Sequence, residues 1–200
     1  MDMDRRIIGL SLIIAMLLAS TAAYAKMVSI EINANDKDVE GRIDTYSQIN
    51  WAVLNLGAGV LYSEEGYTIG NVHFSLKDQV FIPALSLGLG FKGIGGRVET
   101  DERDMDAGAV GFMLLGDYDF RERYLNFPLV VYADFTWAPD PMSFADTERY
   151  TEFTTGLRFY IVKNAGLTTG YRHLYLRFDH DGRTDSASDS SVFVGLEINF

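Results

Sequence analysis

The residues that could perform covalent chemistry are a histidine and a serine two positions apart, in His73-Phe74-Ser75. Residues at this spacing in a strand project from the same face, and an imidazole beside a hydroxyl can activate it as a nucleophile when an acid is also near. That set of groups is typical of acyl hydrolases. Asn71 and Lys77 share the same face, however, which is equally typical of a polar interior. We therefore predict no catalytic residue, and we expect that the protein is not an enzyme.

A second candidate is the acidic segment Asp179-His-Asp-Gly-Arg-Thr-Asp185. Oxygen ligands at alternate positions and a glycine at the turn are typical of calcium loops. No glutamate follows at the position of the bidentate ligand, and Arg183 would stand beside any ion. We expect a solvated loop here, with no metal site and no cofactor.

The third set comprises charged residues that lie on polar strand faces: Lys77, Glu152, Arg158 and Glu197. Ionisable groups are costly in lipid, so in a membrane barrel they should point into the lumen. Opposite charges in a narrow lumen can satisfy one another. We predict that these four residues form a polar network that plugs the lumen, because an eight-stranded barrel is just wide enough for its own side chains.

The elements that must position these residues are strands. Apolar and polar residues alternate with a period of two along most of the chain, which predicts an all-β, antiparallel, up-and-down transmembrane barrel with short turns at one end and longer loops at the other. The predicted strands are 51–62, 67–77, 81–98, 105–118, 125–137, 150–162, 166–179 and 191–200. The predicted long loops are 99–104, 138–149 and 180–190.

Two segments do not fit this arrangement of eight alternating strands. Leu174, Leu176 and Phe178 share a strand face with Arg172, which a β-bulge would reconcile. In 26–50, Val28-Ser-Ile-Glu-Ile32 alternates and predicts a further strand. Either this segment lies outside a barrel of eight strands, or 42–50 also spans and the barrel has ten, or the second and third strands are divided differently. We favour eight.

The expected face assignments follow from the same alternation. Aromatic residues at strand ends should form girdles at the membrane interfaces; they are Trp51, Tyr62, Tyr118, Trp137, Tyr150 and Phe178. The rows expected to face lipid include Leu54–Tyr62, Leu85–Phe91, Phe127–Trp137 and Phe153–Ile161, each read at every second residue.

The N-terminus has the organisation of a secretory signal peptide. Arg5 and Arg6 precede an apolar run, and Ala23-Tyr24-Ala25 matches an A-x-A cleavage site. We predict a signal peptide over residues 1–25, cleaved after Ala25, and one barrel domain over residues 26–200. The formal net charge of −11 and the lack of a basic patch exclude nucleic acid as a partner.

The chain ends on alternating apolar residues, Val194, Leu196, Ile198 and Phe200. An exposed apolar edge is a hazard in water but is satisfied in a closed membrane barrel. This ending resembles the C-terminal signal of bacterial outer-membrane barrels, which implies recognition by the barrel-assembly machinery and transit with periplasmic chaperones. We expect location in the bacterial outer membrane among lipid and lipopolysaccharide, with Phe200 in the periplasm and the long loops outside.

Six segments, taken in order, resemble the YfaZ-type outer-membrane proteins: 28–32, 85–91, 132–139, 150–158, 170–172 and 193–200. The resemblance covers nearly all of the chain after residue 25 and is most specific after Phe127, whereas 42–51 departs from it. It implies an outer-membrane barrel and transfers no catalytic residue. We expect a structural or interaction protein with acidic outer loops and a plugged lumen. The alternatives are a narrow channel for ions or small molecules and a lipid A-modifying acyl hydrolase.

Overall fold

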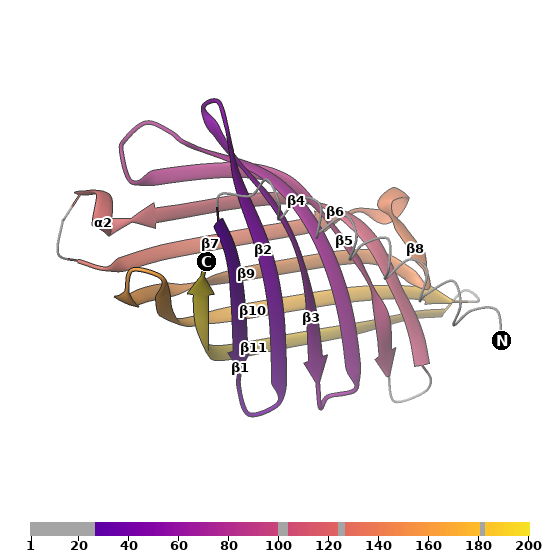
Figure 1. The fold of residues 1–200 in the computed structure, drawn as a ribbon. Helices are drawn as coiled ribbons and strands as arrows, with labels where there is room; N and C mark the ends of the chain where they lie inside the picture. The colour runs from indigo at the N-terminus through magenta and orange to yellow at the C-terminus, as the bar shows by residue number, and fades with distance from the viewer. Residues whose placement is uncertain (1–26, 100–103, 124–126, 181–182) are drawn as a thin grey trace.

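The alternating segments form ten long antiparallel strands in the computed structural model, which describes residues 27–99, 104–123, 127–180 and 183–200 (Figure 1). Three short elements, α2 (Phe120–Arg123), η1 (Asp140–Met142) and β8 (Ser143–Ala145), lie in the connections, and β8 pairs with β6. The long strands are β1 (Met27–Ala34), β2 (Asp38–Ile49), β3 (Ala52–Ser63), β4 (Tyr67–Gln79), β5 (Leu85–Glu99), β6 (Asp104–Asp119), β7 (Leu129–Ala138), β9 (Thr147–Val162), β10 (Ala165–His180) and β11 (Arg183–Asn199).

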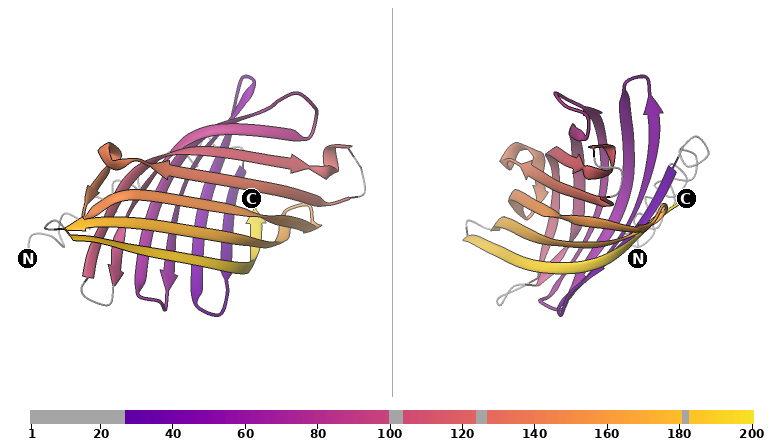
Figure 2. Two further views of the ribbon diagram at one scale, coloured as in Figure 1. Left: turned by 180° about the vertical axis from the view of Figure 1, so that it is seen from behind. Right: turned by 90° about the vertical axis from the view of Figure 1, so that its left-hand side faces the viewer.

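The strands close into a barrel because the first pairs with the last. Each long strand pairs with its neighbours along the chain, and β1 pairs with β11 in a register that sets Ile30 opposite Ile198. Backbone hydrogen bonds of 3.1 and 2.8 Å join Val28 and Phe200. The last part of β11 bends towards β1, and the N-terminal and C-terminal strands form opposite, crossing walls (Figures 1 and 2). Met27 and Phe200 therefore lie at one end of the barrel, the terminal end; the opposite end is the loop end.

The strand count is ten rather than the favoured eight, so the alternative left open by the sequence is the one found. Segment 26–50 supplies both additional strands, β1 and β2, and β2 begins at Asp38, earlier than the spanning segment expected from 42. An even number of strands keeps both termini at the same end.

The outward faces are as predicted on most strands. Exposed rows of large apolar side chains run along β3, β5, β7, β9 and β11, with Leu89 66% and Val194 64% exposed. Side chains so apolar and so exposed are stable only in lipid, which identifies a transmembrane barrel. No helix among the described residues is long and apolar enough to cross a membrane.

Several predicted boundaries are corrected. The strand predicted over 81–98 begins at Leu85, because Phe81 and Ala84 have φ of 63° and 83° and form a turn. The loop predicted over 180–190 is mostly strand: β10 and β11 pair up to His180 and Arg183. These strands continue past the apolar rows, where outward Ser186, Ser188 and Ser190 suit water rather than lipid.

Two of the six predicted girdle residues, Tyr150 and Phe178, face inwards and are 1% and 0% exposed. The irregularity expected within 170–178 occurs only at its end: β10 keeps its register with β9 from Gly166 to Arg177, and the register shifts between Arg177 and Phe178. Arg172, Leu174 and Leu176 precede this shift, so they share the inner face of β10 without a bulge between them.

An apolar cluster explains why these residues can face inwards. Buried side chains from β3, β4, β5, β6, β7, β9 and β10 pack together inside the loop end of the barrel. This loop-end cluster comprises Leu61, Tyr67, Ile69, Ile94, Val98, Met105, Ala107, Ala109, Ala138, Tyr150, Leu174, Leu176 and Phe178. The barrel thus has an apolar core at the loop end and a polar lumen towards the terminal end.

Candidate functional site in the lumen

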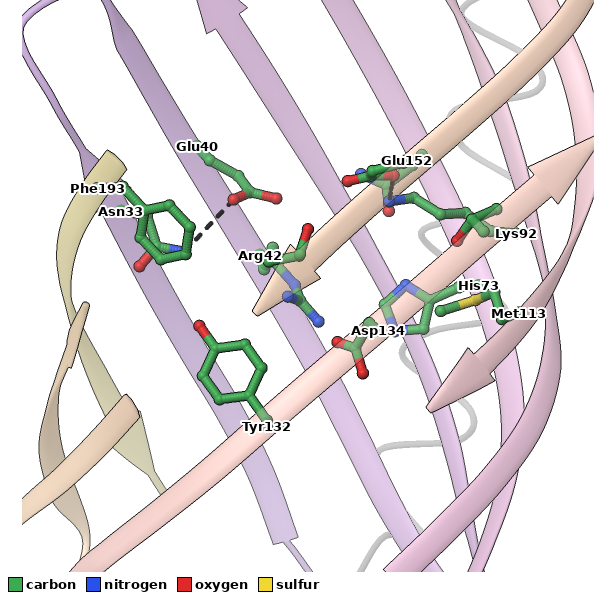
Figure 3. A pocket seen from close by; sticks show the side chains of 13 residues that line it. Asn33, Glu40, Arg42, His73, Lys92, Met113, Tyr132, Asp134, Glu152 and Phe193 are labelled. Atoms are coloured by element: carbon green, nitrogen blue, oxygen red, sulfur yellow. Dashed lines mark hydrogen bonds and ion pairs between the residues drawn. The ribbon is translucent and has the colours of Figure 1, made fainter. Parts of the chain in front are cut away.

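The polar part of the lumen holds a cavity of about 670 Å³ at the terminal end. Its deep end carries Arg42, His73 and Asp134, and its mouth carries Trp51 and Glu122. A second space of about 20 Å³ continues towards the loop end between Glu40, Lys92 and Glu152 (Figure 3). The three residues at the deep end line both spaces. We call the larger space the terminal cavity.

All four residues of the predicted polar network point into the lumen, but they belong to three separate groups. Lys77 on β4 forms an ion pair with Asp117 on β6. Glu152 on β9 pairs with Lys92 on β5 and accepts a hydrogen bond from the hydroxyl of Tyr150. The Lys77–Asp117 pair therefore bridges over β5, whereas the Lys92–Glu152 pair crosses the lumen.

The third group joins Arg158 and Glu197 in an ion pair and adds Glu31 from β1, whose Oε2 lies 3.4 Å from Nη2 of Arg158. The two glutamates also accept hydrogen bonds from asparagines on their own strands: Asn33 donates to Glu31 at 2.9 Å, and Asn199 donates to Glu197 at 2.7 Å. Every carboxylate in this group is therefore satisfied.

Arg172 occupies the boundary between the polar lumen and the loop-end cluster. It is 2% exposed, and its two Nη atoms lie 3.0 Å from Asp38 and 3.3 Å from Glu40. Its Nη2 also donates to the hydroxyl of Ser191. A buried guanidinium needs such partners, and here both carboxylates come from β2.

Arg42, His73 and Asp134 line the junction between the two spaces (Figure 3), and Asp44 pairs with the first two of them. The Nε2 atom of His73 lies 2.7 Å from Oδ1 of Asp44, and Arg42 lies 3.6 Å from the other oxygen of Asp44. Asp134 comes from β7, on the wall opposite β2, and its carboxylate projects towards Arg42 and His73. Within the described residues it makes no hydrogen bond and no ion pair within 4 Å.

The acyl-hydrolase hypothesis receives no support from this geometry. His73 and Ser75 are both buried inside the barrel, and His73 is paired with Asp44, but no hydrogen bond joins it to Ser75 among the described residues. The acyl chains of membrane lipids lie against the opposite face of β4.

Carboxylates outnumber basic groups in the polar lumen of the described structure, with eight against five. Such an excess of three negative charges is unfavourable in a space surrounded by lipid, and a protonated His73 would offset one at most. The basic residues are Arg42, Lys77, Lys92, Arg158 and Arg172. The acidic residues are Glu31, Asp38, Glu40, Asp44, Asp117, Asp134, Glu152 and Glu197.

The mouth of the terminal cavity is framed by α2 and the β4–β5 turn. Arg121 forms a 2.5 Å ion pair with Asp119, which raises the pKa of the guanidinium, and stacks over the Tyr160 ring at 3.9 Å. Glu122 accepts hydrogen bonds from the side chain of Gln79 at 2.7 and 2.8 Å and from the backbone of Ala84 at 3.1 Å. These contacts fasten α2 to β9 and to the β4–β5 turn.

The predicted absence of a calcium loop concerns a segment that is only partly described. Residues 181–182 lie outside the described residues, and on either side Asp179 pairs with Thr184 in the β10–β11 ladder. In the part of the chain that the structure describes, no three His, Cys, Asp or Glu side chains are arranged to hold a metal ion.

The residues that sequence reasoning missed come mainly from β1 and β2. Glu31, Glu40, Arg42 and Asp44 alternate along these strands, and that alternation was the available signal. The signal is weak on β2 because the other face of this strand includes Gly41, Thr45 and Ser47 and so does not form a clear apolar row.

Comparison with known proteins gives one family match. A family model described as YfaZ precursor matches residues 6–200. No curated protein matches the chain.

Three solved structures are similar over most of the chain. The NanC porin is 12% identical and covers 86% of this chain and 98% of its own, with a TM-score of 0.49. The KdgM porin is 11% identical, covers 86% and 96%, and has a TM-score of 0.44. Neisserial surface protein A is 12% identical, covers 87% and 94%, and has a TM-score of 0.38. These values are too low to bear on function.

Proposed function

The chain belongs to the YfaZ family, and from this membership and the geometry of the lumen we propose that it is an outer-membrane barrel with a structural or interaction role and a closed lumen. The terminal end lies in the periplasm in this proposal, because outer-membrane barrels keep their chain ends there. A signal peptide cleaved after Ala25 directs its export.

The proposal that the lumen is closed rests on the loop-end cluster. Tyr150, Leu176 and Phe178 are each at most 1% exposed, although all three point towards the barrel axis. An ion that crossed this layer would lose its hydration without finding a polar partner. The terminal cavity therefore ends blindly below the cluster.

The interaction role is supported by the charge of the loop end. Asp36, Glu64 and Glu65 lie in its first two turns, and Lys37 forms an ion pair with Glu65. The neighbouring Glu65 carboxylate raises the pKa of Lys37. The surplus of acidic groups suits contact with divalent ions or with basic partners at the cell surface.

The test is conductance in planar lipid bilayers. The purified chain should give no stable single-channel steps at a protein load that inserts many barrels. A double variant Leu176→Ala and Phe178→Ala, which thins the cluster, should give steps, whereas the lipid-facing Leu196→Ala should stay silent. Stable steps from the unaltered chain would overturn the closed lumen.

A narrow channel is the second candidate, and the terminal cavity favours it. About 670 Å³ of polar space leads from the mouth to the middle of the barrel, so only the cluster separates the two sides. The same recording distinguishes the two proposals.

A further inference from the structure

We propose that the terminal cavity binds a small organic cation, with the carboxylate of Asp134 as its counter-ion. The proposal concerns the half of the lumen below the loop-end cluster. It does not depend on whether that cluster closes the barrel, because the cavity, its lining and its charge are the same in either case.

Asp134 is the group that most needs a partner. Each of the other seven carboxylates of the polar lumen has a basic or hydrogen-bonding neighbour, whereas Asp134 has none within 4 Å in the described chain. Its carboxylate stands at the inner end of the cavity, facing Arg42 across the lumen (Figure 3). Ionised carboxylates inside a membrane barrel are stable when paired, so an unpaired one at the end of a cavity indicates a cationic occupant.

The net charge of the lumen also indicates a positively charged ligand. The excess of three carboxylates is not relieved at the mouth, where Asp78, Asp119 and Glu122 line the cavity against Arg121. Walls of low dielectric focus such a field and raise the local concentration of cations. An anionic ligand would meet this field with the wrong sign.

Ser75 gives an independent indication. It lines the cavity at 2% exposure, and its hydroxyl makes no hydrogen bond in the described structure. A hydroxyl oxygen accepts hydrogen bonds, so an ammonium group in the cavity can donate to it.

The lining favours an organic cation over a metal ion. Tyr46, Trp51 and Tyr132 contribute aromatic surface, which attracts ammonium groups over the ring faces and contacts their carbon chains. No three acidic or histidine side chains of the described residues converge to coordinate a metal. A volume of about 670 Å³ is of the size that proteins use for small molecules.

The experiment is isothermal titration calorimetry on the full mature barrel in nanodiscs at low salt, where charge interactions are not screened. The probe is 1,4-diaminobutane. Its uncharged analogue 1,4-butanediol, sodium succinate and calcium chloride are titrated in parallel. The diamine should bind and the other three should not.

The variant Asp134→Asn keeps the shape of the side chain and removes its charge. It should weaken diamine binding about ten- to a hundredfold, as expected for loss of a hydrogen bond to a charged group. Asp104→Asn, at the exposed loop end of β6, removes the same charge elsewhere and should bind as the unaltered chain does. The heat-dependent gel mobility of folded barrels verifies that each variant has assembled.

Equal binding of diamine and diol would overturn the proposal, because the site would then recognise neutral polar molecules. Binding of succinate or calcium in place of the diamine would also overturn it. If Asp134→Asn does not assemble, the comparison of diamine with diol on the unaltered barrel still decides the class of ligand. Failure of these titrations would leave the conductance result untouched.

Discussion

Replacement of Arg172 by leucine should destabilise the barrel more than any other single loss of charge in the lumen. The guanidinium is 2% exposed and lies within 3.3 Å of both Asp38 and Glu40. Removing it leaves two carboxylates without their cation and raises the excess of negative charge from three to four. Loss of one partner from a buried pair costs about 3–5 kcal/mol, and one charge pair at 4 Å with an effective dielectric constant of 20 gives a similar value, about 4 kcal/mol.

The assay is reversible unfolding by urea from lipid vesicles, followed by tryptophan fluorescence. The two reporters are Trp51, at the mouth of the terminal cavity, and Trp137, on the outer face of β7, and the emission of both changes when the barrel unfolds and leaves the lipid. The free energy of unfolding of Arg172→Leu should fall by about 3–5 kcal/mol. Adding Asp38→Asn to that variant should recover part of the loss, since the two sites share one interaction.

The control is Arg97→Leu, which removes an exposed ion pair whose closest atoms are 3.8 Å apart. Exposed pairs contribute about 0–1 kcal/mol, so this variant should unfold as the unaltered chain does. A loss below about 1 kcal/mol for Arg172→Leu would refute the reasoning, because the lumen would then be hydrated enough to screen its charges.

Three further predictions concern folding and export. Gly96→Ala should destabilise the barrel by about 1–3 kcal/mol, because its Cβ would lie 2.1 Å from a backbone oxygen of β4, whereas Gly95→Ala, with no atom within 4 Å, should be tolerated; urea unfolding compares them. Phe200→Ala should slow assembly by the barrel-assembly machinery in a reconstituted vesicle assay, while leaving the stability of assembled barrels almost unchanged; normal assembly rates would contradict the signal assigned to the C-terminus. The mature chain should begin at Lys26, and intact mass spectrometry would exclude cleavage after Ala25 if it gave another N-terminus.

The membrane-spanning faces could be predicted from the sequence because lipid imposes one rule: side chains that face lipid are apolar, and those that face the lumen can be polar. Leu85, Leu87 and Leu89 alternate with small or polar residues, and all three face outwards. The rule fails on β10 beyond the lipid. There water surrounds the barrel, and the inner face carries Leu174 and Leu176 as in a soluble protein. The outer face of β10 is apolar within the lipid, but beyond the lipid it is the inner face that is apolar. Alternation with a period of two does not say where along the strand this change occurs.

For the site in the lumen, the sequence predicted which side chains point inwards but not which of them pair with one another. Alternation assigned Glu152, Arg158 and Glu197 to the lumen, but their partners depend on which strands face each other across it. Arg158 on β9 and Glu197 on β11 are separated by β10, and their side chains meet over the inner face of that strand. Glu152 instead pairs with Lys92 from the other side of the lumen. These distances follow from the number of strands and the tilt of the barrel, neither of which a single sequence states.

The number of strands also decides the charge of the lumen. Without β1 and β2, the polar lumen would hold four basic groups and four carboxylates and would be neutral. These two strands add one basic residue, Arg42, and four acidic ones, Glu31, Asp38, Glu40 and Asp44. Two additional strands also widen a barrel, so the side chains that fill eight strands no longer fill ten. The segment that was hardest to assign from sequence is thus the one that opens the terminal cavity and makes it anionic, and a barrel built from the other eight strands should show neither the cavity nor an affinity for cations.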